Sequence, residues 1–379
     1  MKKSTTFTTI VQTLLSEEEI QSVVQDVEYE EKARKFTTST LLHYWAMAAF
    51  EEWEGFRYGA DRSSSCGLPS ANYSTFSKKA SDVPYTVFKK LFHHLVSKCN
   101  RATRRKLAIP KKLLLVDSTT ITVGKPRLPW ALYHGKRAGI KLHVAFDPDQ
   151  ETPVHVIESI GSKHDSPFLD QLANPSFLLV ADRAYGKIER FDQYLKDKQS
   201  FVIRIKENVT IDTPRSLRRC SSTASSVIKD STCYLGTSQC RSQERHRVIF
   251  FTDDEGNEIR VVTDRRDLSA EKIAEIYKAR WQIETFFRWI KQHVNVPVLF
   301  GTTKNAVYGQ LYTALITYVL IKWIYEKAKP MVSRFAMLSF IQFARLLRFE
   351  SLQVEWMIAI HTVVSESLLI QGSSLSKIG

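Results

Sequence analysis

Residues 269–294 read SAEKIAEIYKARWQIETFFRWIKQHV and hold the most informative pattern in the chain. The apolar residues recur at helical spacing, which predicts one amphipathic helix over the stretch. At about 100° per residue, a second set of residues falls in a narrow polar band beside the apolar stripe. These are Tyr277, Arg280, Glu284 and Lys291, spaced Y-x2-R-x3-E-x6-K, together with Arg288. An ordinary surface ion pair would explain Arg280 and Glu284. It would not explain why Tyr277 and Lys291 extend the polar band along the helix.

The composition indicates a polyanionic partner. The 379 residues hold 54 Lys and Arg against 40 Asp and Glu, a formal net charge of +14. Nucleic acid is the first candidate for such a basic chain, with a ribosomal, membrane-surface or merely basic protein as the alternative. The five cysteines are odd in number and lack C-x2-C spacing, which argues against a zinc site or a disulfide framework and fits a reducing cytosol.

No membrane contact is expected. The chain begins without an apolar signal segment, and its longest apolar run, residues 314–321, is too short to cross a bilayer. Residues 1–106 have the pattern of an all-helical region. Two of its expected helices, 74–80 and 85–98, form either a helix-turn-helix reader of DNA or a plain helical hairpin. The basic linker that follows, residues 100–112, would track phosphates or serve as a solvated hinge.

The sequence pattern predicts three further regions after residue 106. Residues 107–206 and 266–328 alternate strands with helices, which predicts an α/β domain with a mixed sheet. Residues 207–265 are rich in Ser, Thr and Arg with short β-like runs, which indicates a β-rich insertion in that domain. Residues 329–379 are expected to be a C-terminal helical region.

Two aspartates each follow a continuous apolar run. LLLV at 113–116 precedes Asp117, and FLLVA at 177–181 precedes Asp182. Such runs predict strands buried on both faces, with a separate strand starting again at Thr120. Carboxylates at the ends of central strands lie at the sheet edge where ligands bind. For either aspartate alone, a turn-capping role is the commoner explanation.

A helix that packs on the same sheet would bring Glu284 to these aspartates. Three converging carboxylates repel one another unless they are protonated or bridged by cations. Two divalent ions about 4 Å apart would solve that problem and would also activate a water or hydroxyl for phosphoryl transfer. Hard oxygen ligands favour Mg²⁺, with Mn²⁺ as a substitute.

These residues resemble the DDE transposases of bacterial insertion sequences, in the group with the Y-x2-R-x3-E-x6-K signature. The matching segments are LLLVDSTT around Asp117, LLVADRAYG around Asp182 and the helix YKARWQIETFFRWIK. The similarity runs from about residue 113 to residue 320. The chain departs from many relatives at Ala184, where they have glycine.

The resemblance implies a ribonuclease H-like catalytic core, an N-terminal DNA-binding domain and metal binding by Asp117, Asp182 and Glu284. It implies nicking at the terminal inverted repeats, then attack of the freed 3′-hydroxyl on target DNA, with flanking strands released through a hairpin intermediate. The protein would act as a homodimer in a synaptic complex, in the bacterial cytoplasm at the nucleoid. The side chains that would contact DNA are Tyr277, Arg280 and Lys291, with Trp281, Arg183 and Arg288 as further candidates.

Two polar residues near these segments have simpler explanations. His143 is expected in the core or supporting the metal ligands, and Asp165 is expected to cap a short helix. Two other functions remain open from the sequence: a non-catalytic, co-opted DNA-binding protein, and a ribonuclease H-like nuclease without strand transfer. A pure binder would not need three carboxylates, and a plain nuclease would not need the stripe formed by Tyr277, Arg280 and Lys291.

Overall fold

The computed structural model describes residues 3–103, 112–218, 225–294 and 296–375. The chain forms two compact units, one built from residues 1–106 and 288–379 and the other from residues 107–287. Most of the basic linker expected at 100–112 lies outside the described residues. Residues 288–328, assigned from the sequence to the catalytic domain, fall in the first of these units. The roles assigned to the predicted domains stay predictions.

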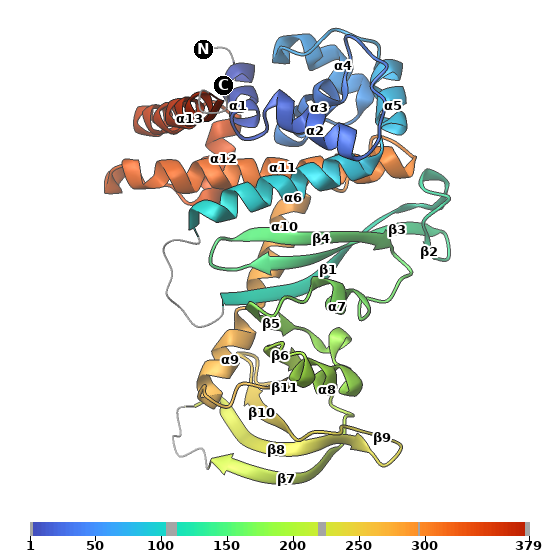
Figure 1. Ribbon diagram of the computed structural model, residues 1–379, viewed down its shortest axis with the longest axis vertical. Coiled ribbons are helices and arrows are strands. Elements are labelled where there is room, and N and C mark those ends of the chain that lie inside the picture. The colour runs from blue at the N-terminus through green and yellow to red at the C-terminus, as the bar shows by residue number, and fades with distance from the viewer. Residues whose placement is uncertain (1–2, 104–111, 219–224, 295, 376–379) are drawn as a thin grey trace. The chain divides into compact units, whose positions relative to one another are not determined.

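The first unit is helical throughout its described part (Figure 1). The long α11 is buried along most of its length and packs against α3, α5 and α6, so it forms the centre of this unit. Among the described helices, none combines the length and apolar character needed to span a bilayer. The helices are α1 (Lys3–Leu14), α2 (Glu17–Asp26), α3 (Thr38–Phe50), α4 (Phe56–Ser63), α5 (Tyr73–Asp82), α6 (Tyr85–Thr103), α11 (Lys304–Ala328), α12 (Phe340–Arg348) and α13 (Val354–Leu375).

The second unit is built on one mixed sheet with the order β2-β3-β1-β5-β6-β11-β10-β8-β7 (Figure 1). β4 pairs with β3, and β9 pairs with β8. The strands are β1 (Lys112–Gly124), β2 (Leu132–His134), β3 (Arg137–Asp147), β4 (Thr152–Ile160), β5 (Phe177–Ala181), β6 (Phe201–Arg204), β7 (Ile211–Arg218), β8 (Val227–Thr237), β9 (Cys240–Arg241), β10 (His246–Thr252) and β11 (Glu258–Thr263). The short helices α7 (Phe168–Leu172) and α8 (Ile188–Lys196) connect its strands. A mixed sheet with helices was predicted and is confirmed.

The first strand is longer than predicted. A strand ending before Asp117 and a new one starting at Thr120 were expected, but β1 is continuous through both. β3 pairs with it antiparallel from Leu115 to Gly124, and this ladder supplies backbone hydrogen bonds across the polar run. The placement of Asp117 at a strand end was therefore wrong. It lies inside β1, one residue beyond the last parallel pair with β5, Val116 with Ala181.

The predicted β-rich segment forms strands, and these continue the same sheet. β11 pairs antiparallel with β6, and β10, β8 and β7 follow outward. Buried Arg247 on β10 forms an ion pair of 2.7 Å with Asp230 on β8, and it also donates to the carbonyls of Arg265 and Leu268. Arg247 therefore connects β10 and β8 to the loop that leads into the next helix. Whether the segment is a separate domain stays a prediction.

The stretch expected to be one helix is two. α9 (Ala270–Lys278) and α10 (Trp281–His293) are separated by a tight turn at Ala279 and Arg280. Here the helical hydrogen bonds shorten to a three-residue spacing: the Arg280 N–H donates to the carbonyl of Tyr277, and the Ile283 N–H to that of Arg280. Such 3₁₀ geometry inside a helical segment often marks a functional hinge or a strained sequence. Arg280 thus leaves from a turn, not from a regular helix face.

Candidate active site

Asp117 and Asp182 lie side by side in the sheet. β1 and β5 are parallel neighbours, and the last residues that pair between them directly precede the two aspartates. β5 ends at Ala181, so Asp182 follows the strand as predicted and begins a 3₁₀ turn. The apolar runs that precede both aspartates are buried in the sheet, which fixes the two carboxylates at one place on it.

Glu284 comes from the first turn of α10. The beginning of this helix packs on the same sheet: Ile283 is fully buried, and the Phe286 ring lies 5.0 Å from that of Phe146 on β3. α9 is held similarly, since Tyr277 lies against Phe251 of β10 with ring centroids 6.1 Å apart. The apolar stripe predicted from the sequence therefore positions the polar one.

Arg280 joins two of the three carboxylates. Its Nη1 donates to Asp117 Oδ2 at 3.0 Å, and its Nη2 donates to Glu284 Oε1 at 2.7 Å. The planar guanidinium can hold both because its N–H groups form a rigid fork. The buried Nε of Arg280 has no hydrogen-bond partner within the described part of the chain.

Tyr277 supports the third carboxylate. Its hydroxyl donates to Asp182 Oδ1 at 3.2 Å. Burial, and then the charge of Asp182, raise the pKa of Tyr277 to about 12, so the hydroxyl stays protonated and remains a donor. The tyrosine and arginine of the signature thus both contact carboxylates here, and helical spacing alone predicted only the pair of Arg280 with Glu284.

The site holds more negative charge than its own cation offsets. Burial raises the pKa of Asp117 to about 6, against the hydrogen bond from the Ser118 N–H and the charge of Arg280, while Asp182 and Glu284 raise it further. For Arg280, burial favours the neutral form, but Tyr277 and the carboxylates hold its pKa above the usual value. One guanidinium beside three carboxylates leaves room for added positive charge.

The donor set fits a hard divalent cation, since carboxylate oxygens are the ligands that Mg²⁺ and Mn²⁺ prefer. Within the described residues, no three His, Cys, Asp or Glu side chains are grouped closely enough to hold a metal ion as they stand. The Arg280 guanidinium bridges Asp117 and Glu284 instead. The carboxylate oxygens are thus suitable metal ligands by their chemistry. In this structure the Arg280 guanidinium supplies the positive charge between Asp117 and Glu284.

A fourth carboxylate lies beside the site and was assigned differently from the sequence. Asp165 accepts hydrogen bonds from Ser118 Oγ at 2.9 Å and from Lys141 Nζ at 3.0 Å. The expected helix cap is wrong, because α7 has Pro167 at its N-cap and no side-chain cap. The available signal was the polar Ser118 next to Asp117, together with Lys141 between the apolar residues Ile140 and Leu142.

His143 lies in the core as expected. Its ring is fully buried and stacks on Phe168 with centroids 3.7 Å apart, and its Nε2 lies 2.8 Å from Ser159 Oγ. Burial lowers the pKa of His143 to about 4, against the charge of Asp165, so the ring is neutral at pH 7.

The other predicted DNA contacts are on the surface or half-buried. Trp281, the first residue of α10, is 61% exposed, and Arg183 and Arg288 are exposed as well. Lys291 lies two turns beyond Glu284 on α10 and is half-buried, and this burial lowers its pKa. Their contact with DNA stays a prediction.

A mixed sheet that carries two aspartates at its parallel centre, with a glutamate held beside them by arginine, defines a protein of the acid-triad (DDE) class. The family model described as "Transposase DDE domain" matches residues 109–320, which include all three carboxylates. The chain belongs to this family, among the transposases of insertion sequences.

Two relatives with similar sequences are described as transposases. The chain is 49% identical, over 100% of both chains, to the probable transposase for insertion sequence element IS5377 of Geobacillus stearothermophilus. It is 33% identical to the putative transposase y4zB of Sinorhizobium fredii, over 63% of this chain and 67% of that one. The solved synaptic complex of piggyBac transposase with hairpin DNA has a TM-score of 0.48 and 12% identity, covering 94% of this chain and 84% of the other.

Proposed function

We propose that this transposase excises its insertion sequence at the terminal inverted repeats and joins it to target DNA by a cut-and-paste mechanism. Family membership supports transposition. The observation that carries the chemistry is the double contact of Arg280 with Asp117 and Glu284, beside Asp182. We also assign residues 107–287 a ribonuclease H-like core, supported by the strand order β4-β3-β1-β5-β6 with its antiparallel and then parallel pairing.

Asp117, Asp182 and Glu284 would hold two divalent ions, Mg²⁺ or its substitute Mn²⁺. When bound, such ions activate an attacking oxygen and stabilise the leaving one in phosphoryl transfer. Arg280 keeps Asp117 and Glu284 together although they come from different elements, and Tyr277 fixes the orientation of Asp182. Burial raises the pKa of Asp117, and the charges of Asp182 and Glu284 raise it further, so a bound cation would favour the ionised form of this carboxyl.

DNA would be held by the same polar stripe. The guanidinium of Arg280 would contact a phosphate oxygen near the cut, and Tyr277 lies beside it. Lys291 and Arg288 would contact the backbone further along, with Arg183 beside Asp182. The exposed indole of Trp281 would stack on a base. A homodimer in a synaptic complex, with release of the flanks through a hairpin, completes this proposal, and a DNA substrate implies a location at the nucleoid in the cytoplasm.

The test is cleavage of a labelled duplex that ends in the native inverted repeat and continues into flanking donor DNA. The full-length chain is assayed with Mg²⁺, with Mn²⁺ and with EDTA, beside Glu284→Gln. Glu275→Gln is the matched control, because Glu275 lies on α9 in an exposed pair with Lys272. We expect metal-dependent nicking at the element boundary and strand-transfer products, both lost in Glu284→Gln with DNA binding retained.

Each of the other possible results would support a different function or a different third acid. Binding without cleavage in any metal would indicate a co-opted DNA-binding protein. Nicking without strand-transfer products would indicate a nuclease. Equal cleavage by wild type and Glu284→Gln would mean that another residue is the third acid.

A further inference from the structure

The helix α13 carries apolar side chains on its exposed side as well as on its buried side. Its buried side packs against α11 and α1, and it includes Trp356, Ala359, Ile360 and Val363. The exposed stripe consists of Val354, Met357, Ile358 and Leu368. At about 100° and 1.5 Å per residue, these four side chains fall in one band about 100° wide and about 21 Å long. A helix that is apolar on both sides is normally buried, so the exposed stripe is expected to have a partner.

The segment before α12 extends this stripe with a fully exposed phenylalanine, Phe335. The backbone around Phe335 is held beside the first turn of α13 by two hydrogen bonds. The Ser333 N–H donates to Glu355 Oε2 at 3.0 Å, and the Trp356 Nε1–H donates to the carbonyl of Ala336 at 2.8 Å. Phe335 and the exposed stripe together form what we call the α13 surface. Contiguous exposed apolar side chains of this kind mark an interaction site.

The charges on α13 argue against DNA as the partner. The helix contains Glu355 and Glu366 and no Lys or Arg, although the whole chain has a net charge of +14. Phosphates would therefore meet two carboxylates and no cation along this helix.

The rest of the chain does not supply a cover for the α13 surface either. Within residues 1–379, the longest stretch outside the described part is 104–111, which reads RRKLAIPK and is basic. The stretch 376–379 has four residues, which is too few for a stripe about 21 Å long. The cover is therefore a protein surface of another molecule.

We propose that the α13 surface binds the same surface of a second copy of this chain, with the two α13 helices antiparallel about a twofold axis. A surface that pairs with itself in this way must be complementary to itself. Glu355 and Glu366 are about three turns apart and lie on the same flank of the exposed stripe. A twofold axis near His361 places Glu366 of one copy beside the first turn of α13 in the other. The exposed Arg334 lies next to that turn, since it follows Ser333 directly.

This arrangement makes two ion pairs of Arg334 with Glu366, one on each side of the axis, around a centre of apolar contacts. Phenylalanine and methionine are enriched in the centre of protein interfaces, and charges are found at the rim. The inference rests on the proposed function in one respect, because joining two element ends requires two chains to be brought together. It uses none of the three acids.

The first test measures self-association of the full-length chain by analytical ultracentrifugation, without metal, both free and bound to an inverted-repeat duplex. We expect a dimer, and we expect Ile358→Glu to raise the dissociation constant at least about tenfold, because it buries a charge in the apolar centre. The substituted side chain is exposed, so thermal unfolding should be unchanged.

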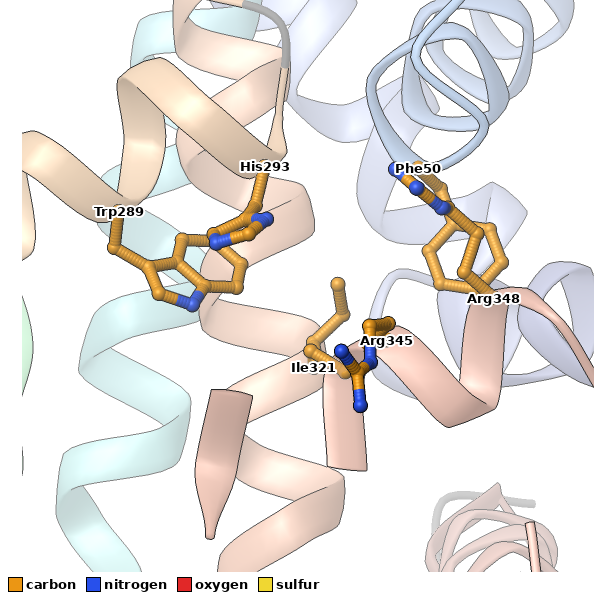
Figure 2. A pocket seen from close by; sticks show the side chains of 7 residues that line it. Phe50, Trp289, His293, Ile321, Arg345 and Arg348 are labelled. Atoms are coloured by element: carbon orange, nitrogen blue, oxygen red, sulfur yellow. The ribbon is translucent and has the colours of Figure 1, made fainter. Parts of the chain in front are cut away.

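Ile341→Glu is the matched control. Ile341 is 53% exposed, against 61% for Ile358, but it lies on another side of α12. This helix turns Phe343 toward Trp356 of α13, with ring centroids 4.8 Å apart. By helical spacing, Ile341 instead shares the side of Arg345 and Arg348. Those two arginines line a pocket of about 70 Å³ that α12 forms with α3, α10 and α11 (Figure 2). Ile341→Glu should associate as wild type does.

The second test exchanges the charges at the rim. Arg334→Glu should weaken the dimer about twofold to fivefold, and the double variant Arg334→Glu with Glu366→Arg should restore it. Within one chain, Glu366 lies about 16 Å along α13 from the turn next to Arg334, so restoration reports a contact between two copies.

Three results would overturn the proposal. One is a wild-type chain that stays monomeric, free and on DNA, and another is a dimer that Ile358→Glu leaves intact. The third is a loss of DNA affinity in Ile358→Glu but not in Ile341→Glu, without self-association, which would identify DNA as the partner. A double variant no tighter than Arg334→Glu would rule out the antiparallel arrangement. Cleavage is assayed separately: association without cleavage contradicts the proposed reaction and leaves this interface standing, and cleavage without association does the opposite.

Discussion

Arg280 contacts Asp117 and Glu284 with different nitrogens of one guanidinium, and this double contact depends on the fork that only arginine has. Arg280→Lys keeps the charge but can engage the two carboxylates only as a single point. Since a hydrogen bond between charged groups contributes about 1.5–3 kcal/mol, we expect nicking to slow about tenfold to a hundredfold. Single-turnover cleavage of the inverted-repeat duplex measures this, with DNA affinity changed less than cleavage.

Arg266→Lys is the control for this prediction. Arg266 is exposed near the start of α9 and contacts none of the three acids. It should cleave as wild type does. If Arg280→Lys also cleaves at the wild-type rate, the bridging geometry has no role in the reaction.

His143 makes the stability of the sheet unit depend on pH. Its folded pKa of about 4 lies below the unfolded value of about 6.5, because the ring is buried. The unfolded chain therefore takes up a proton between these values and the folded chain does not. This contribution to stability is complete above about pH 6.5 and is lost as the pH falls to about 4.

The groups that face His143 are Asp165, Lys141 and Glu158, with Ser159 on its Nε2 and Phe168 on its ring. His143→Gln removes the titrating group. Urea unfolding at pH 7 and pH 4.5 should show a loss of stability that is smaller in the variant by roughly 1–3 kcal/mol. An identical loss in both proteins would show that the imidazole does not titrate between these pH values.

The identity of the three candidate acids could be predicted at the scale of single residues, because each lies next to a strong local pattern. Asp117 and Asp182 follow apolar runs, and Glu284 lies on an amphipathic segment. Apart from the pairing of Glu284 with Arg280 one helical turn away, the hydrogen-bond partners of these acids could not be predicted. Asp165 reaches Ser118 only because the loop before α7 folds back over β1, and no periodicity in the sequence encodes that contact.

At the scale of elements, the tight turn between α9 and α10 is the main departure from the sequence prediction. Helical periodicity continues across it, so pattern alone predicts one helix. In β1 the local pattern instead predicted a break that the structure lacks. The polar run Asp117, Ser118 and Thr119 resembles the end of a strand. Antiparallel pairing with β3 keeps them extended, and such pairing depends on residues more than twenty positions away.

The turn predicts the effect of an inserted residue. One alanine added between Ala279 and Arg280 would rotate Arg280 and Glu284 by about 100° relative to α9. Tyr277 would keep its contact with Asp182, whereas the contacts of Arg280 with Asp117 would be lost. We expect cleavage to fall below detection while thermal unfolding stays cooperative.

The matched control is one alanine inserted after Gly256, in the exposed turn between β10 and β11. This variant should cleave normally, since loop tips tolerate insertions. Cleavage by the first variant at the rate of the second would show that the register of Arg280 and Glu284 relative to α9 is unimportant.

At the scale of the whole molecule, the sheet unit is continuous in the sequence and the helical unit is not, because residues 107–287 separate its two segments. The sequence predicts a boundary near residue 107 from the change from helical to strand patterns. It did not indicate the second, which falls inside α10, because one amphipathic helix serves both units. Ile283 and Phe287 are buried in one unit and Trp289 in the other. The sequence shows only apolar residues at helical spacing and does not tell which unit each one joins.

A continuous unit with its own core predicts that residues 107–294, with α10 complete, fold alone. The fragment keeps the buried cluster of the sheet and all three acids. Most of the net positive charge is left behind, however, since residues 107–294 hold 30 Lys and Arg and 24 Asp and Glu, which is six of the fourteen net charges. We expect a single cooperative thermal transition and DNA binding at least tenfold weaker than that of the full chain at about 0.1 M salt. Calorimetry and a fluorescence anisotropy titration measure the two quantities. A broad, non-cooperative transition would mean that the sheet unit needs the helices to fold, and undiminished binding would place the main DNA contacts on the sheet unit.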